Sequence, residues 1–168
     1  MNQRLLVFVL AIFLSFPAYA GVADFLNGVK LGQPLPEHNP QFIGTAPDTT
    51  NKLLLIDFWA THCAPCVTSI PEVNALHDKF APKGLLIIGL SDETEAKVKP
   101  FLEKHPMRYA SAVEGSKSLQ KALRIKASPY AIFVDRNGKI VWRGQPDDIT
   151  DELVESLLRL NAKVSIAK

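Results

Sequence analysis

The chain has 168 residues, of which 47% are hydrophobic and 21% are charged, with a formal net charge of +2 and two cysteines. This length fits one domain, and the near-average charged fraction argues against long disorder. The balanced charge provides no large basic patch of the kind that nucleic-acid binding uses, and two cysteines are too few for a disulfide-dense secreted scaffold. We therefore expect one globular domain that carries a single dithiol, Cys63 and Cys66.

The first twenty residues have the pattern of a secretory signal peptide. Arg4 provides the positive start, residues 5–16 form a run of twelve that is apolar except for one serine, and Ala18-Tyr19-Ala20 has the small-x-small form of a cleavage site. Twelve apolar residues are fewer than the roughly twenty that span a bilayer. We expect cleavage after Ala20 and a location in the periplasm or another extracytoplasmic space. An uncleaved membrane anchor remains the alternative.

Composition divides the rest of the chain into three parts. Residues 21–51 are rich in Pro, Asn, Gly and Thr, which predicts an irregular N-terminal arm with a short helix at 22–29 and a short strand near 41–44. Residues 52–162 are expected to form the main domain, and residues 163–168 a tail.

The hydrophobic pattern after residue 52 predicts alternating strands and helices. The run at 53–59 is apolar apart from Asp57, which is typical of a strand buried on both faces. Apolar positions spaced by three and four predict a helix that starts at the first cysteine, is kinked by Pro71 and ends at Gly84. The elements expected next are a strand at 85–90, a helix capped by Ser91 that reaches His105, a strand at 109–113, a helix at 116–124 capped by Ser116, a strand at 130–134, a tight Asn-Gly turn at 135–138, a strand at 139–143 and a last helix capped by Thr150.

This order of elements predicts an α/β fold with a mixed central sheet between helices. Strands that are joined by helices should be parallel, whereas the last two strands should form an antiparallel hairpin.

The two cysteines stand where a strand ends and a helix begins. At a helix N-terminus the free N–H groups and the helix dipole stabilise a thiolate, so Cys63 should be the nucleophile with the lowered pKa. Cys66 lies one turn further along and should be the more buried, resolving thiol. Pro65 costs no hydrogen bond in the first turn. The spacing allows a Cys63–Cys66 disulfide to form and break.

These residues resemble the thioredoxin superfamily, and more closely its exported TlpA/ResA/CcmG-like branch of thiol–disulfide oxidoreductases. The resemblance rests on the block from Asp57 to Cys66, on Pro71, on the pair Ser128-Pro129 and on the hairpin Asn137-Gly138. It covers most of the chain, from about residue 31 to residue 160. An extra helix and strand within residues 92–113 are what distinguish that branch from minimal thioredoxins.

The resemblance implies a role for each matching residue. Pro129 matches the family's cis-proline, which lies against the dithiol while the backbone of Ser128 faces an extended substrate. Asp57 matches the buried acid that accepts the proton of the resolving thiol, so that Cys63, Cys66 and Asp57 form the expected catalytic set; the alternative for Asp57 is an ion pair with a lysine. The residues expected to contact substrate are Trp59, His62, Pro65, Ser128 and Pro129, although Trp59 and His62 also fit a packing and a rim role.

Two departures from the family pattern affect the mechanism. His62 stands where the family usually has a second tryptophan, and a protonated imidazole there would favour the Cys63 thiolate. Several exported members carry a glutamate on the helix after the dithiol, whereas residues 67–69 are Val, Thr and Ser.

The resemblance implies a reductase of disulfides in exported proteins, with apocytochrome c as one candidate substrate and cytochrome c biogenesis as the setting. A DsbD/CcdA-like membrane thiol carrier would supply electrons. We expect a monomer without cofactor, metal or nucleic-acid partner, in contact with the membrane only if the signal segment stays as an anchor. Two alternatives remain: a DsbA-like oxidant, and a copper-binding module that uses Cys63, Cys66 and His62.

Overall fold

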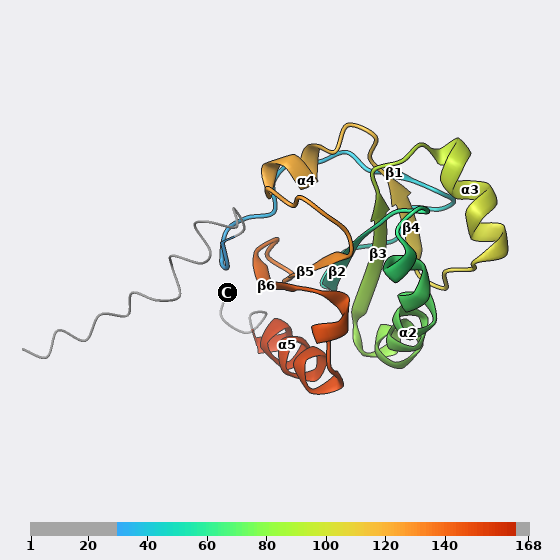
Figure 1. Cartoon of the computed structure of the whole chain (residues 1–168). Coiled ribbons are helices and arrows are strands. Elements are labelled where there is room, and N and C mark those ends of the chain that lie inside the picture. Colours follow the sequence, from blue (N-terminus) through green and yellow to red (C-terminus); the bar gives the residue numbers. More distant parts are fainter. Residues whose placement is uncertain (1–29, 164–168) are drawn as a thin grey trace, which may run out of the picture.

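A six-stranded sheet forms the centre of the structure, a computed structural model in which residues 30–163 are described (Figure 1). The predicted signal peptide at 1–20, the helix at 22–29 and nearly all of the tail at 163–168 lie outside these residues. Within the described part of the chain, no helix is long and apolar enough to cross a membrane.

The sheet has the order β1-β4-β3-β2-β5-β6. Strands β2, β3 and β4 are parallel to one another, and β1, β5 and β6 pair with their neighbours in the antiparallel sense. The strands are β1 (Gln41–Phe42), β2 (Leu53–Trp59), β3 (Leu85–Ser91), β4 (Ala110–Val113), β5 (Tyr130–Val134) and β6 (Ile140–Gly144). The two longest strands, β2 and β3, lie at the centre, because nearly every one of their side chains is buried.

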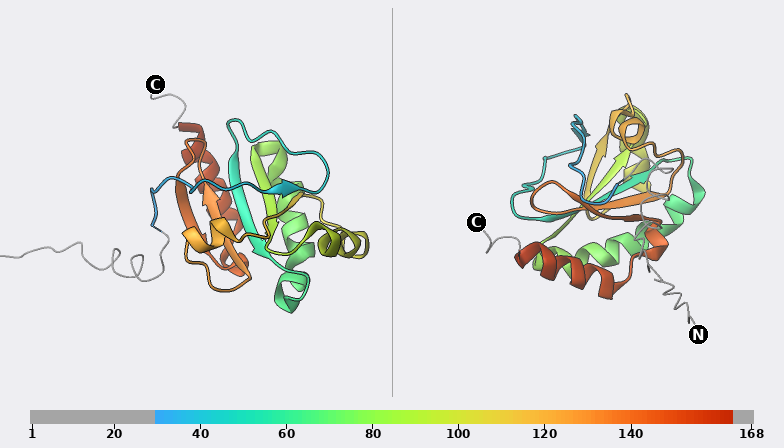
Figure 2. Two further views of the ribbon diagram at one scale, coloured as in Figure 1. Left: turned by 90° about the horizontal axis from the view of Figure 1, so that it is seen from above. Right: turned by 90° about the vertical axis from the view of Figure 1, so that its left-hand side faces the viewer.

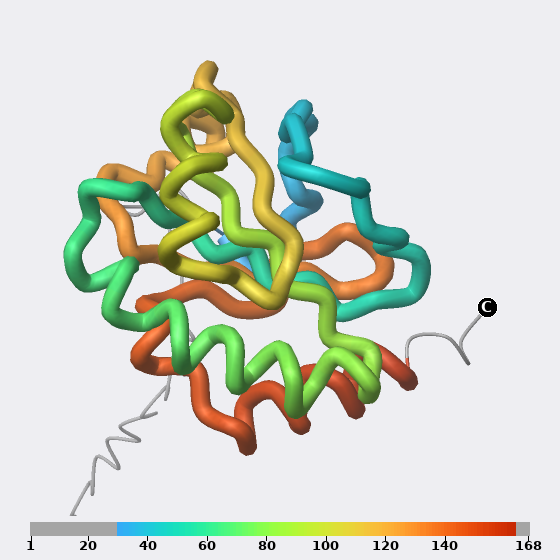
Figure 3. The backbone as a smooth tube through the Cα atoms, turned by 90° about the vertical axis from the view of Figure 1, so that its right-hand side faces the viewer, coloured from blue at the N-terminus to red at the C-terminus, as the bar shows by residue number. Residues whose placement is uncertain are grey.

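Helices cover both faces of the sheet. The long helices α2 (Ala64–Phe80) and α5 (Asp151–Lys163) run side by side on one face (Figures 2 and 3). The short helix α4 (Ser118–Ala122) covers the other face, where the buried residue Leu119 packs in one cluster with Ile56 and Leu90. Helix α3 (Glu95–Lys104) packs Val98 against Trp59 at the end of β2. The predicted α/β fold with a mixed central sheet is therefore confirmed, and α3 and β4 are the predicted additional helix and strand.

Two of the predicted helix starts were wrong. Ser91 is the last residue of β3 and is fully buried, and α3 begins only after Thr94. Ser116 does not cap α4 either. The buried carboxylate of Glu114 accepts hydrogen bonds from Ser118 Oγ at 2.5 Å and from Leu119 N at 3.0 Å, and so satisfies the free donors of that helix. At Ser91 the pairing of β3 extends through the predicted cap, and at Ser116 another local residue, Glu114, provides the cap.

The predicted turn and the predicted last cap are both present. Gly138 has a φ of 74°, and its N–H donates to the carbonyl of Asp135 at 2.9 Å, which closes the β5–β6 hairpin. Thr150 Oγ1 accepts from Leu153 N at 3.2 Å at the start of α5. The turn pairs β6 with β5, and β5 itself pairs with β2, the strand that leads to the dithiol.

Candidate active site

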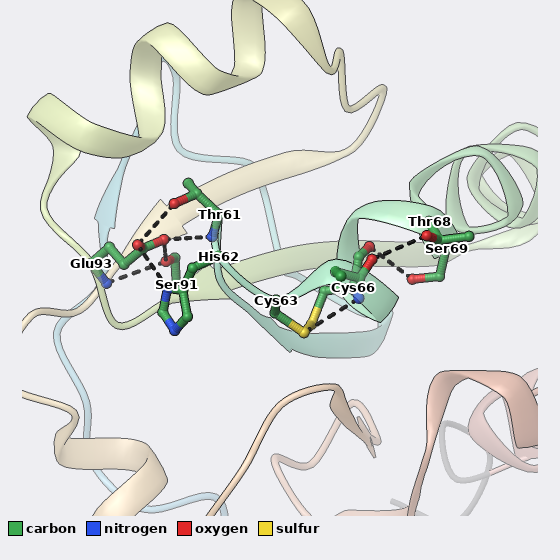
Figure 4. The surroundings of a disulfide bond; sticks show 9 residues. Thr61, His62, Cys63, Cys66, Thr68, Ser69, Ser91 and Glu93 are labelled. Carbon is green, nitrogen blue, oxygen red and sulfur yellow. Dashed lines mark hydrogen bonds and ion pairs between the residues drawn. A yellow bond between two sulfur atoms is a disulfide. The ribbon is translucent and has the colours of Figure 1, made fainter.

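The dithiol lies at the N-terminus of α2, directly after β2 (Figure 4). Cys63 is the N-cap residue, and its Sγ accepts a hydrogen bond from Cys66 N at 3.3 Å. The first turn of α2 contains no acidic residue, so nothing there opposes a thiolate. The two cysteines form a disulfide with a Cα–Cα distance of 5.3 Å. Cys66 is only 4% exposed and Cys63 is partly exposed, as the assigned roles of resolving thiol and nucleophile require.

The segment before β5 lies beside this pair. The bond between Ser128 and Pro129 is cis, as the resemblance implied. The antiparallel register places Tyr130 opposite Phe58, so the residues before Tyr130 lie at the end of β2 that carries the cysteines. A cavity of about 510 Å³ opens there, lined among others by His62, Cys63, Pro65 and Ser128. Three of the predicted substrate-contacting residues therefore share one cavity with the nucleophile.

Asp57 is buried beneath the site. It is 5% exposed and pairs in register with Gly89 on β3 and Ala131 on β5. It shares a face of β2 with Trp59, whose ring packs in one cluster with Cys66. Burial raises its pKa to about 7. No lysine pairs with Asp57 among the described residues, so the alternative of a satisfied ion pair fails.

Asp57 has polar neighbours that are also buried. Its charge contributes to the raised pKa of the Tyr109 hydroxyl, after the larger effect of burial. Within the described part of the chain, Trp59 Nε1, the Tyr109 hydroxyl and Ser111 Oγ find no hydrogen-bond partner. The polar groups meet around Gly89, where a Cβ would lie 3.1 Å from both Trp59 Nε1 and Tyr109 Cε2. Gly89 is therefore required by a close approach of side chains.

Trp59 does not occupy the place predicted for it. It is 1% exposed, and its ring lies 5.6 Å from that of Phe101, so no substrate can contact it in this structure. Helix α3, which covers Trp59, is the reason for this difference. Trp59 is a core residue that supports the dithiol from below.

Sequence reasoning missed one residue of the site, Glu93. Its side chain is 7% exposed and accepts hydrogen bonds from Thr61 N at 2.6 Å, Thr61 Oγ1 at 2.9 Å and Ser91 Oγ at 3.3 Å. His62 Nδ1 lies 3.2 Å from Glu93 Oε1, and Lys97 forms an ion pair with the same carboxylate. Figure 4 shows Glu93 with its partners Thr61, His62 and Ser91, next to the loop that precedes Cys63. The acidic pair Asp92-Glu93 was the available signal in the sequence. It was interpreted as the first turn of a helix and not as part of the site.

Burial opposes the ionisation of Glu93, but hydrogen bonds from Lys97, Thr61 and His62 outweigh it and lower the pKa to about 2. Because this pKa lies below the unfolded value of 4.5, the carboxylate stabilises the fold above about pH 4.5 and loses that effect as the pH falls towards 2. Glu93 therefore fixes the loop before the nucleophile at neutral pH.

We expect Glu93→Gln to lower the free energy of unfolding at neutral pH by about 2–3 kcal/mol, from the pKa difference between the two states. The deficit should shrink as the pH falls from about 5 to 3, because the unfolded wild-type chain then takes up a proton at Glu93 that the folded chain, with its pKa of about 2, does not. Urea unfolding across this range measures it. The control is Glu95→Gln, whose side chain is 51% exposed and lies 3.9 Å from Lys99, and which should cost less than about 0.5 kcal/mol. Equal effects of the two substitutions would contradict the assignment.

The alternative of a copper-binding module needs metal ligands close to Cys63 and Cys66. Among residues 30–163 no group of three or more His, Cys, Asp or Glu side chains could hold a metal ion, and the ring of His62 is directed to Glu93.

A disulfide at the start of a helix, a cis-proline beside it and a buried acid beneath it, on this sheet, define the class of thioredoxin-fold thiol–disulfide oxidoreductases. Comparison with known proteins agrees. The chain belongs to the Redoxin family, whose pattern matches residues 30–158, and it is similar to the TlpA/ResA/CcmG-like oxidoreductases of the thioredoxin superfamily.

Among relatives, it is 28% identical over 114 residues to the thiol-disulfide oxidoreductase ResA of Bacillus thuringiensis subsp. konkukian, an alignment that covers 67% of this chain and 66% of that protein. It is 32% identical over 95 residues to a ResA of Bacillus cereus, covering 56% of this chain and 55% of that one. The chain thus spans slightly less than two-thirds of the length of the first relative and about half of the length of the second.

Among solved structures, the thioredoxin domain of a thiol-disulfide oxidoreductase from Bacteroides vulgatus aligns with a TM-score of 0.68 at 25% identity, covering 77% of this chain and 99% of that chain. A thiol:disulfide interchange protein from Bacteroides sp. aligns with a TM-score of 0.69 at 24% identity, covering 79% and 92%. The thioredoxin-like fold predicted from the sequence is therefore confirmed.

Proposed function

We propose that this chain is an extracytoplasmic thiol–disulfide oxidoreductase that reduces disulfides in exported proteins. The observation that carries the proposal is the placement of Cys63 at the N-terminus of α2, partly exposed in a cavity that also contains Ser128. The signal-like pattern of residues 1–20 and the similarity to ResA support the location. The resemblance to the TlpA/ResA/CcmG-like branch supports the reducing direction.

The reaction consists of two thiol–disulfide exchanges. The Cys63 thiolate attacks one sulfur of the substrate disulfide, forms a mixed disulfide and releases the other sulfur as a thiolate. Cys66 then attacks Cys63 Sγ and releases the second substrate thiol, so that two electrons pass from the dithiol to the substrate. In this scheme Asp57 takes the proton of Cys66. Burial raises the pKa of its carboxyl group to about 7, and a general base works best when its pKa is close to the working pH.

Electrons must then return to the Cys63–Cys66 disulfide from outside the chain. The proposal includes a DsbD/CcdA-like membrane thiol carrier as the donor, since the extracytoplasmic space lacks the cytoplasmic reductants. Apocytochrome c in its disulfide-bonded form is the proposed candidate substrate, and the reaction would release its two thiols.

The reduction potential of the Cys63–Cys66 pair tests the direction. We expect a value well below the approximately −180 mV of protein disulfide isomerase, together with reduction of insulin in the presence of a metal chelator. A value near −120 mV, typical of DsbA, would instead show an oxidant. Tight cuprous-ion binding that is lost in His62→Ala, without insulin reduction, would show a copper-binding module.

A further inference from the structure

Figure 1 shows the connection between α4 and β5 as a ribbon. Two adjoining cavities lie along this connection, and the first of them contains the dithiol residue Cys63. The first, of about 510 Å³, contains Cys63, and the second, of about 290 Å³, is lined by Tyr130 and Gln145. They share the wall formed by residues 125–127. Together they form a groove, here called the basic groove, that leads from the nucleophile to the end of β6.

The charges along the basic groove are almost all positive. Its lining includes Lys117, Arg124, Lys126 and Arg143, and the one acid among the lining residues, Asp92, forms an ion pair with Lys117. Lys126 and Arg124 are exposed. Since the whole chain has a net charge of only +2, this concentration of cations is a local feature.

The acids nearest in sequence do not neutralise it. Residues 115–134 contain no Asp or Glu. Glu114, just before this stretch, is 5% exposed and directed inward, where it caps α4. Among the described residues no acid pairs with Arg124 or Lys126, so the charges of these two exposed side chains face the solvent.

The backbone of the same segment is available to a ligand. Within the described part of the chain, residues 126–128 make no backbone hydrogen bond, although they lead directly into β5. An extended polypeptide can pair with such a segment. A polypeptide held there would carry its side chains past Arg124 and Lys126.

We propose that the basic groove selects disulfide-bonded polypeptides with acidic side chains within a few residues of the reacting cysteine. This inference rests on the proposed function, because it concerns the substrate of the same dithiol. The cations at the rim are solvated, so they act mainly by steering acidic substrates into the encounter complex.

Three synthetic peptides test the proposal. Each contains one cysteine disulfide-bonded to thionitrobenzoate, with neighbours that are all acidic, all neutral or all basic. The reduced full-length chain is mixed with each peptide: Cys63 attacks the peptide sulfur, thionitrobenzoate leaves with the electron pair of the broken bond, and its release is followed by absorbance. Division by the rate with dithiothreitol corrects for the intrinsic reactivity of each peptide.

We expect the acidic peptide to react about tenfold faster than the basic one at low salt. The preference should shrink as the ionic strength rises, because the Debye length falls from about 10 Å at 0.1 M to about 3 Å at 1 M. The double variant Arg124→Glu, Lys126→Glu should reverse the preference. The control Lys139→Glu reverses one charge instead of two, at an exposed and distant position at the hairpin end of β6, and should leave the preference intact.

The outcomes separate this inference from the proposed function. Equal corrected rates for the three peptides would overturn the charge selection while leaving the oxidoreductase proposal in place. No reaction with any peptide would overturn the oxidoreductase proposal itself. Loss of binding to phosphatidylglycerol vesicles in the double variant, with unchanged peptide rates, would assign the cations to a membrane surface and overturn the inference.

Discussion

Replacing Cys66 with serine is expected to arrest the protein at the mixed disulfide. Cys63 keeps its place at the N-terminus of α2 and can still attack a substrate disulfide. Without the neighbouring thiol, the mixed disulfide has no intramolecular route of resolution, so its lifetime should extend to the minutes or hours of uncatalysed rearrangement. Non-reducing electrophoresis of the variant after incubation with an exported protein extract should show stable adducts, and mass spectrometry would identify the trapped partners.

The matched control is Cys63→Ser, which retains the other thiol of the pair. Cys66 is 4% exposed, whereas Cys63 lines the cavity, so the control should form almost no adducts. Adducts formed equally by both variants would show that the assignment of nucleophile and resolving thiol is incorrect. Apocytochrome c or a membrane thiol carrier among the trapped partners would support the proposed electron path.

Replacing Asp57 with asparagine is expected to stabilise the fold and to slow the resolving step. Asp57 is buried, and burial raises its pKa to about 7 from the ordinary value of 3.8. The unfolded chain therefore releases this proton at a lower pH than the folded chain does, and the carboxylate costs stability as the pH rises. The gain of Asp57→Asn over wild type should grow by about 1.4 kcal/mol per pH unit between about pH 4 and 7, and level off above that.

Although Asp57→Asn should stabilise the fold, it should impair catalysis. Asparagine cannot accept a proton, so Cys66 loses its proposed base, and the resolving step should slow by about 10²–10⁴-fold. Denaturant unfolding of the oxidised protein at several pH values measures the first effect, and rapid-quench analysis of the mixed disulfide measures the second. Formation of the mixed disulfide by Cys63 should change little. If Asp57→Asn resolves the mixed disulfide at the wild-type rate, Asp57 is not the base for Cys66. That result would not affect the prediction on stability.

Prediction succeeded where the signal is local. The apolar run at 53–59, the Asn137-Gly138 turn and the C-x-x-C segment each determine a neighbouring piece of backbone, and all three lie where expected. The boundary error at Ser91 arose because β3 continues through this residue and buries it. The error at Ser116 arose because a neighbouring acid, Glu114, caps α4 in its place.

The order of strands and helices follows from hydrophobic period and turn chemistry along the chain. The class of chemistry follows from the two cysteines at a strand–helix junction and from the resemblance to the thioredoxin superfamily. Other features depend on packing between elements that are far apart in sequence. They are the burial of Asp57 and Trp59, the hydrogen bonds from Glu93 to the loop before Cys63, and the position of Lys126 in the wall of the cavity that contains Cys63. A pKa or a local potential depends on which charges and apolar groups surround an atom in space, and spacing along the chain does not contain that information. For this protein, the reacting sulfurs could thus be identified from the sequence, whereas the groups that tune them and select their substrate required the assembled fold.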